Sequence, residues 1–66
     1  MQIRDLTRSE ADYLQAVCNF TTDENTLFEL RLEEIPLEEC AERMNISLPT
    51  AKRLHDRVKK KIEREI

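Results

Sequence analysis

The chain of 66 residues contains no glycine, and this absence restricts its fold more than any other feature. Glycine adopts the positive φ angles of tight β-hairpin turns most readily, so a small β-sheet protein is difficult to build without it. Helical connections tolerate the absence better, because asparagine can replace glycine at a left-handed helix end. Hydrophobic residues make up 39% of the chain, which is enough for a modest core. The sequence therefore predicts one all-α domain over residues 1–66.

Two capping boxes predict where the first two helices begin. Thr7 can cap the first helix, with Glu10 reaching back from three residues later, and Thr21 and Glu24 repeat this pattern. Apolar residues then follow at helical spacing. We expect the first helix to have a wide buried face formed by Tyr13, Leu14, Ala16, Val17, Cys18 and Phe20.

The second helix is expected to run through Leu32 and to end before Pro36, which restricts Ile35 to extended geometry. Its apolar residues form two stripes, and a helix that is apolar on two sides is typically the central one. These stripes consist of Phe28, Leu32 and Ile35 on one side, and of Leu27 and Leu30 on the other.

Two further helices are predicted, a short one over residues 37–44 and a longer one that begins after Ser47. Asn45 is suited to the left-handed end of the short helix, and Pro49 falls in the first turn of the long helix, where its missing N–H costs little. The long helix is expected to bury Leu48, Ala51, Leu54, Val58 and Ile62. Together these elements predict a small orthogonal bundle of four helices, or of three plus one, with the support helices over residues 8–34.

Residues 37–56 meet the requirements of a helix-turn-helix, in which two helices cross steeply through a tight turn. Ala41 provides a small side chain at the close approach, and Asn45 tolerates a positive φ in the turn. Ile46 is the apolar residue after the turn, and Ser47 caps the second helix. Ala51 and Leu54 would complete the packing between the two helices.

Charged residues are distributed unevenly along the chain, although its net charge is only −3. Residues 1–35 hold three basic and eight acidic side chains, whereas residues 36–66 hold eight basic and six acidic ones. Within residues 47–62 there are six basic side chains, and Asp56 is the one acidic residue. The C-terminal half of the chain can therefore attract a polyanion that the N-terminal half repels.

The segment from Phe28 to Ser47 resembles region 4 of the bacterial sigma-70 factors and is similar to LuxR-type helix-turn-helix domains. The resemblance covers about residues 22–62 and includes the leucine-arginine step at Leu30 and Arg31, and the Leu-Glu-Glu scaffold helix that starts at Leu37. It implies a four-helix fold whose last helix enters the major groove of duplex DNA. A small DNA-binding transcriptional regulator of bacterial or phage type is the function that this resemblance implies.

The predicted DNA-binding residues lie on the last helix. Lys52 and Arg53 are placed to reach base edges or phosphates, Thr50 can bond a phosphate or a base, and the later cations, Lys61 included, would contact phosphates. The full set is Ser47, Leu48, Thr50, Lys52, Arg53, Asp56, Arg57, Lys59 and Lys60.

No enzyme, cofactor, metal site or membrane segment is predicted. Cys18 and Cys40 are expected as buried hydrophobes, since the chain has neither CxxC spacing nor clustered histidines. His55 is expected at the edge of the core or near the DNA backbone. No run of apolar residues is long enough to cross a membrane, and a cytoplasmic location fits two cysteines without a disulfide pattern.

A protein-interaction module remains the alternative. In that interpretation the helix-turn-helix is only a scaffold that binds RNA polymerase, another regulator or a recombinase without touching DNA. Leu48 and Pro49 favour it, because they open the last helix without hydrogen-bonding side chains, and so does the net negative charge. For the DNA-binding protein itself, RNA polymerase or a second copy of the chain would be the partner that supplies specificity.

Overall fold

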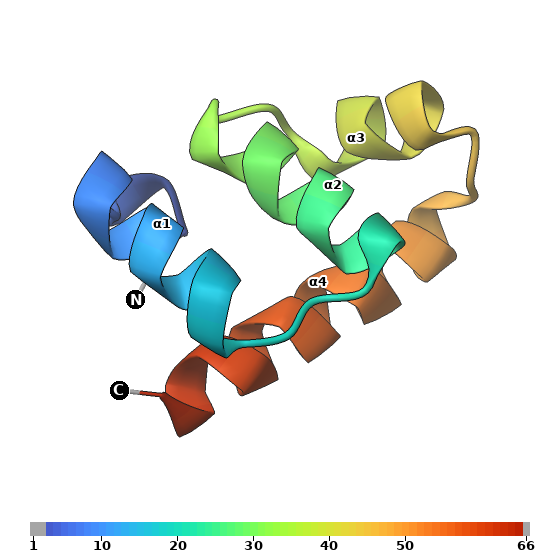
Figure 1. Ribbon diagram of the computed structural model, residues 1–66. Coiled ribbons are helices and arrows are strands. Elements are labelled where there is room, and N and C mark those ends of the chain that lie inside the picture. The colour runs from blue at the N-terminus through green and yellow to red at the C-terminus, as the bar shows by residue number, and fades with distance from the viewer. Residues whose placement is uncertain (1–2, 66) are drawn as a thin grey trace.

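The computed structural model describes residues 3–65 and, over that range, contains helices and their connections but no strand (Figure 1). A short 3₁₀ helix, η1 (Ile3–Asp5), is followed by four α-helices: α1 (Arg8–Val17), α2 (Thr22–Leu32), α3 (Leu37–Met44) and α4 (Leu48–Arg64). The all-α fold expected from the sequence is confirmed. None of the described helices combines the length and apolar character needed to cross a membrane.

Figure 1 shows α4 running along one side of the molecule, with the other three helices on its opposite side. α3 lies toward the beginning of α4, and α1 lies toward its end. α2 packs against α4, α3 and η1, which makes it the central helix as predicted. One long surface of α4 is therefore left outside the bundle.

Both predicted capping boxes are present. The backbone N–H of Glu10 donates to the Thr7 hydroxyl at 3.2 Å, and the Glu10 carboxylate accepts from the Thr7 N–H at 2.9 Å. Thr21 and Glu24 repeat the arrangement with the same two distances. These bonds satisfy amide groups that have no partner within the helix, and they fix the starts of α1 and α2.

Among residues 3–65, three residues adopt a positive φ, and each follows a helix. Asn19, Glu34 and Asn45 have φ angles of 55°, 63° and 56°. At the end of α3, the N–H of Ile46 donates to the Ala41 carbonyl at 3.0 Å, as in a Schellman motif. The expectation that asparagine replaces glycine there is confirmed.

α2 ends before Pro36, as predicted, but its end is set by a residue that the sequence did not single out. The helix ends at Leu32, because Glu34 turns the backbone into the left-handed region. The N–H of Ile35 donates back to the Leu30 carbonyl at 3.2 Å, which closes the helix before Pro36 is reached. Ile35 is nevertheless buried, but as part of the connection to α3.

The core is one cluster to which every helix contributes. Leu27 and Phe28 of α2 are fully buried at its centre, and the ring of Phe28 lies 5.1 Å from that of Phe20, centroid to centroid. The cluster consists of Ile3, Ala11, Leu14, Cys18, Leu27, Phe28, Ile35, Cys40, Leu54, Val58 and Ile62.

The buried face of α1 is narrower than predicted. Leu14 and Cys18 are buried as expected, but Tyr13, Ala16 and Val17 are exposed. The prediction of a wide apolar face on this helix was wrong, because α1 packs onto the bundle along a single stripe. Ala11, which the sequence did not single out, lies in that stripe and is fully buried.

Candidate nucleic-acid interface

The candidate interface is the outer face of α4, and its position follows from how the helix starts and packs. Ser47 caps the helix by accepting the N–H of Thr50 at 3.3 Å. Pro49 follows in the first turn, where it interrupts no helical hydrogen bond. The inward side buries Ala51, Leu54, Val58 and Ile62, as predicted, with Leu48 half-buried. Because this stripe faces the core, most of the charged residues between its members face outward.

α4 contains seven basic and two acidic side chains. Six of the basic side chains and both acidic ones are exposed, namely Lys52, Arg53, Asp56, Arg57, Lys59, Lys60, Glu63 and Arg64. Helical spacing divides these eight into two stripes, since residues three and four apart lie on the same side of a helix.

The first stripe is purely basic. Arg53, Arg57, Lys60 and Arg64 follow one another at steps of four, three and four residues, and we call them the basic stripe. With a rise of about 1.5 Å per residue, the stripe is roughly 16 Å long. None of its four cations forms an ion pair with any residue between positions 3 and 65. The basic stripe is therefore a row of positive charge with no internal counterion among the described residues.

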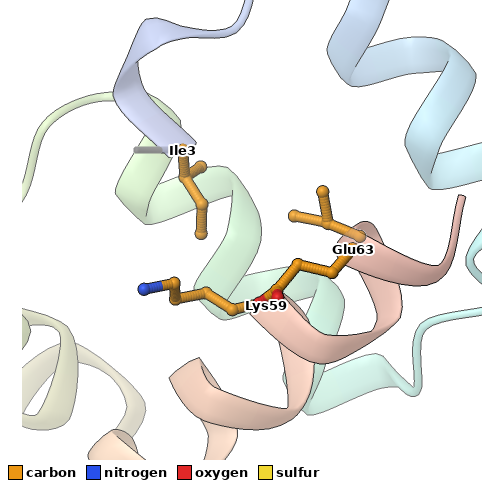
Figure 2. A pocket seen from close by; sticks show the side chains of 4 residues that line it. Ile3, Lys59 and Glu63 are labelled. Atoms are coloured by element: carbon orange, nitrogen blue, oxygen red, sulfur yellow. The ribbon is translucent and has the colours of Figure 1, made fainter. Parts of the chain in front are cut away.

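In the second stripe, positive and negative side chains alternate. Lys52, Asp56, Lys59 and Glu63 have the same steps of four, three and four, and we call them the mixed stripe. It borders an open pocket of about 330 Å³ between η1 and α4, which Figure 2 shows with Ile3 on one side and Lys59 on the other. Alternating charges attract a polyanion much less than the basic stripe does. Lys52 and Lys59 therefore lie on a less positive surface than Arg53, Arg57 and Lys60.

The residues that open α4 are engaged in its cap. The hydroxyls of Ser47 and Thr50 lie 2.9 Å apart, and Ser47 also accepts the backbone N–H of Thr50. Leu48 is half-buried and Pro49 is exposed. The start of α4 thus presents hydroxyls that already share a hydrogen bond, next to an apolar surface.

Two basic side chains of α4 do not match the predicted set of DNA contacts. Lys61 was expected among the phosphate contacts, but it lies on the core side of α4, where its ammonium group donates to Glu24 at 2.5 Å and to the Asn19 carbonyl at 3.3 Å. Lys61 therefore joins α4 to α2 and is unavailable to a ligand. Arg64 was missed, although its spacing of four from Lys60 identifies it as a member of the basic stripe.

Glu24 is the partner of Lys61 and is only 2% exposed. Burial by itself raises the pKa of this carboxyl, but the hydrogen bond and charge of Lys61 oppose burial, as do the bonds from Thr21. The bonds and the charge together lower the pKa by more than burial raises it, so the pKa of Glu24 lies below its ordinary value. The Glu24 carboxylate is consequently ionised at neutral pH.

His55 is half-buried at the edge of the core, beside the mixed stripe. Burial lowers its pKa, and the positive charges of Arg31 and Lys59 lower it further, against a smaller opposing effect of Asp56. Arg31 donates from Nη1 to the Ile35 carbonyl at 2.8 Å, while its buried Nε has no partner among residues 3–65. His55 is therefore neutral at physiological pH and adds no charge to the outer face of α4.

Cys18 and Cys40 are both buried, free thiols. Burial is the main cause that raises the pKa of each, so both remain protonated at neutral pH. Within residues 3–65, no group of His, Cys, Asp and Glu side chains is arranged to hold a metal ion. The expectation that both cysteines act as small core residues is confirmed by their burial.

Comparison of the chain with protein-family models, with curated proteins and with solved structures finds no match.

Proposed function

We propose that this protein binds duplex DNA through the outer face of α4. The observation that carries the proposal is the basic stripe: four exposed cations in a row, without a counterion among the described residues, on a face that the bundle leaves open. Unpaired cations that follow one helix face are the electrostatic feature by which proteins neutralise DNA phosphates. The acidic side chains of the N-terminal half keep that half away from the same polyanion.

In this proposal α3 and α4 act as a helix-turn-helix, with α4 in the major groove. Arg57, Lys60 and Arg64 bind phosphates, and Arg53, one turn into the helix, reads base edges. Lys52 and Asp56 border the groove, and Lys59 stands further out beside the pocket. Ser47, Leu48 and Thr50 approach the DNA at the start of α4, where Leu48 offers only apolar contact.

Regulation of transcription is the role that the resemblance to sigma-70 region 4 adds to DNA binding. In this role the protein is not an enzyme, needs no cofactor, and acts in the cytoplasm of a bacterium or its phage. RNA polymerase or a second copy of the chain would supply the specificity that one small module lacks.

The experiment is a titration of a labelled duplex with the protein at several salt concentrations. For the double variant Arg57→Gln/Lys60→Gln we expect the slope of log K against log salt to fall by about 1.8, since each phosphate contact contributes about 0.9. Arg8→Gln/Arg43→Gln is the matched control, because it removes the same charge from side chains that already form ion pairs with Asp12, Glu29 and Glu39. Equal slopes for the two double variants would show that DNA binding, if any, uses another surface.

A protein-interaction module without DNA contact is the second candidate. It is favoured by Leu48 and Pro49 at the start of α4 and by the exposed apolar side chains of α1. In this candidate the protein binds RNA polymerase, another regulator or a recombinase. It predicts no retention of the wild-type protein on duplex DNA even at low salt, which the same titration measures.

A further inference from the structure

The first half of α4 presents three exposed side chains directly away from the core. Pro49, Arg53 and Asp56 follow one another at steps of four and three residues, which place them on one side of the helix. The buried stripe of α4 lies on the opposite side. We call these three residues the crest of α4. When α4 lies in the major groove of DNA, the crest is the side that faces the base edges.

Asp56 is the acidic residue of the crest, and basic side chains surround it. The positions three and four residues before and after it are its neighbours on the helix surface, and all are exposed cations: Lys52, Arg53, Lys59 and Lys60. Arg8 and Asp12 on α1 are also four residues apart, and they form an ion pair at 3.2 Å. Asp56 forms no ion pair with any of the described residues, from 3 to 65. Its carboxylate oxygens are therefore available to a ligand.

A carboxylate only accepts hydrogen bonds, and this limits the bases that it can contact in the major groove. Guanine presents two acceptors there and thymine presents one, so both repel a carboxylate. Adenine presents a donor next to an acceptor, and cytosine presents an amino donor alone. Cytosine is therefore the base that a carboxylate contacts best.

The phosphates on both sides of the groove repel an acidic side chain, so a single carboxylate on a DNA-facing helix weakens binding to every sequence. The four cations around Asp56 offset this repulsion, because they carry positive charge into the groove with the carboxylate. A hydrogen bond to cytosine adds a favourable contact at one base alone. An acid in this position thus contributes to discrimination between sequences more than to affinity.

We propose that Asp56 is a specificity residue, whose carboxylate accepts a hydrogen bond from the N4 amino group of a cytosine next to the base that Arg53 reads. This inference rests on the proposed function, because it requires α4 to lie in the major groove. Arg53 and Asp56 are separated by three residues, or about 4.5 Å along the helix. Base pairs are stacked about 3.4 Å apart, so the two side chains meet neighbouring base pairs.

The test is selection of bound duplexes from a random pool with the wild type and with Asp56→Asn. We expect the wild type to enrich cytosine at one position. Asparagine keeps the shape of aspartate but pairs with both N6 and N7 of adenine, so Asp56→Asn should enrich adenine at that position instead. Titration of the two selected duplexes should show that the ratio of their affinities changes at least about fivefold between the proteins.

Glu63→Gln is the matched control, because Glu63 is the other exposed acid of the mixed stripe and lies outside the crest. It removes the same charge and should raise the affinity for all duplexes without changing the selected base. Asp56→Ala is the second variant, and it should lose the preference for cytosine without gaining one for adenine. Circular dichroism checks that each variant keeps its helix content.

The same titrations distinguish this inference from the proposed function. A wild type that binds duplexes with the expected salt dependence but shows no preference for cytosine would overturn the role of Asp56 and leave DNA binding intact. An unchanged cytosine preference in Asp56→Asn, or an equal change of preference in Glu63→Gln, would do the same. A wild type that binds no duplex at low salt would overturn both.

Discussion

The ammonium group of Lys61 lies 2.5 Å from the carboxylate of Glu24, and this pair connects the last turns of α4 to the first turn of α2. The Glu24 side chain is 3% exposed and that of Lys61 is 24% exposed, so water screens the pair little. Lys61 also donates to the carbonyl of Asn19, in the link between α1 and α2. Three segments of the chain therefore meet at one ammonium group.

We predict that Lys61→Met destabilises the protein by about 2 kcal/mol, because it leaves the Glu24 carboxylate buried without its charged partner. Lys60→Met is the control, since Lys60 is exposed and unpaired within residues 3–65, and it should change stability by less than about 0.5 kcal/mol. Urea unfolding of both variants measures the difference. If both variants lost the same free energy of unfolding, the Lys61–Glu24 pair would not contribute to stability.

The depressed pKa of Glu24 predicts a dependence of stability on pH. A carboxyl whose pKa is lower in the folded state contributes stability above its ordinary pKa of 4.5, and this contribution is lost as the pH falls through the folded-state pKa. Wild type should therefore exceed Glu24→Gln in unfolding free energy at neutral pH, and the difference should shrink in acid. Unfolding curves from pH 7 to about pH 3 test this. A difference that stays constant over that range would contradict the prediction.

Glu34 adopts a φ of 63° at the end of α2, a conformation that costs residues with a Cβ atom more than glycine. We predict that Glu34→Gly stabilises the protein by about 0.5–1 kcal/mol, after the greater flexibility of glycine in the unfolded chain is subtracted. Glu33→Gly removes the same charge one residue earlier, where φ is −82°, and should destabilise. Thermal melts of the two variants should shift in opposite directions.

Ala41 is 4% exposed on α3, the helix that packs against the first half of α4. Ala41→Leu adds bulk where no space is left and should cost about 1–3 kcal/mol. The exposed neighbour Glu42 is the control position, and Glu42→Leu should be nearly neutral. An unchanged melting temperature for Ala41→Leu would show that α3 and α4 do not approach closely at this residue.

Arg53 is the residue of the basic stripe nearest the start of α4, and it is predicted to read a base. A bidentate contact between arginine and guanine is worth about 1–3 kcal/mol of discrimination, so Arg53→Ala should relax the preference at one base pair. Arg57→Gln/Lys60→Gln should lower affinity for all sequences alike. Selection of bound duplexes from a random pool distinguishes the two effects. An unchanged preference in Arg53→Ala would exclude direct readout by this residue.

The helix starts and the end of α3 were predictable because capping depends on residues within about four positions of each other. Thr7, Thr21, Asn45 and Ser47 all act through such local bonds. The left-handed turn that ends α2 was not predictable, since glutamate has no local preference for the conformation that Glu34 adopts. The chain compensates for its lack of glycine with two asparagines and one strained glutamate.

Features that depend on the neighbours of a helix were harder to predict. Apolar spacing identifies Tyr13 and Val17 as one side of α1, but only packing decides whether that side is covered. Lys61 resembles its neighbours Lys59 and Lys60 in sequence, and its partner Glu24 lies 37 residues away. For the candidate site, the sequence located the basic helix, whereas the division into a basic and a mixed stripe required knowledge of which side of α4 is buried.

The basic stripe also affects the protein in the absence of any ligand. Arg53 and Arg57, and likewise Lys60 and Arg64, are like charges four residues apart, and each such pair weakens a helix by about 0.2–0.5 kcal/mol. The inward side of the same helix supplies Val58 and Ile62 to the core, so this repulsion acts on the stability of the whole domain. Salt screens the repulsion, and a bound polyanion neutralises it. The repulsion within the basic stripe therefore lowers the stability of the free protein, and a bound polyanion would remove that loss.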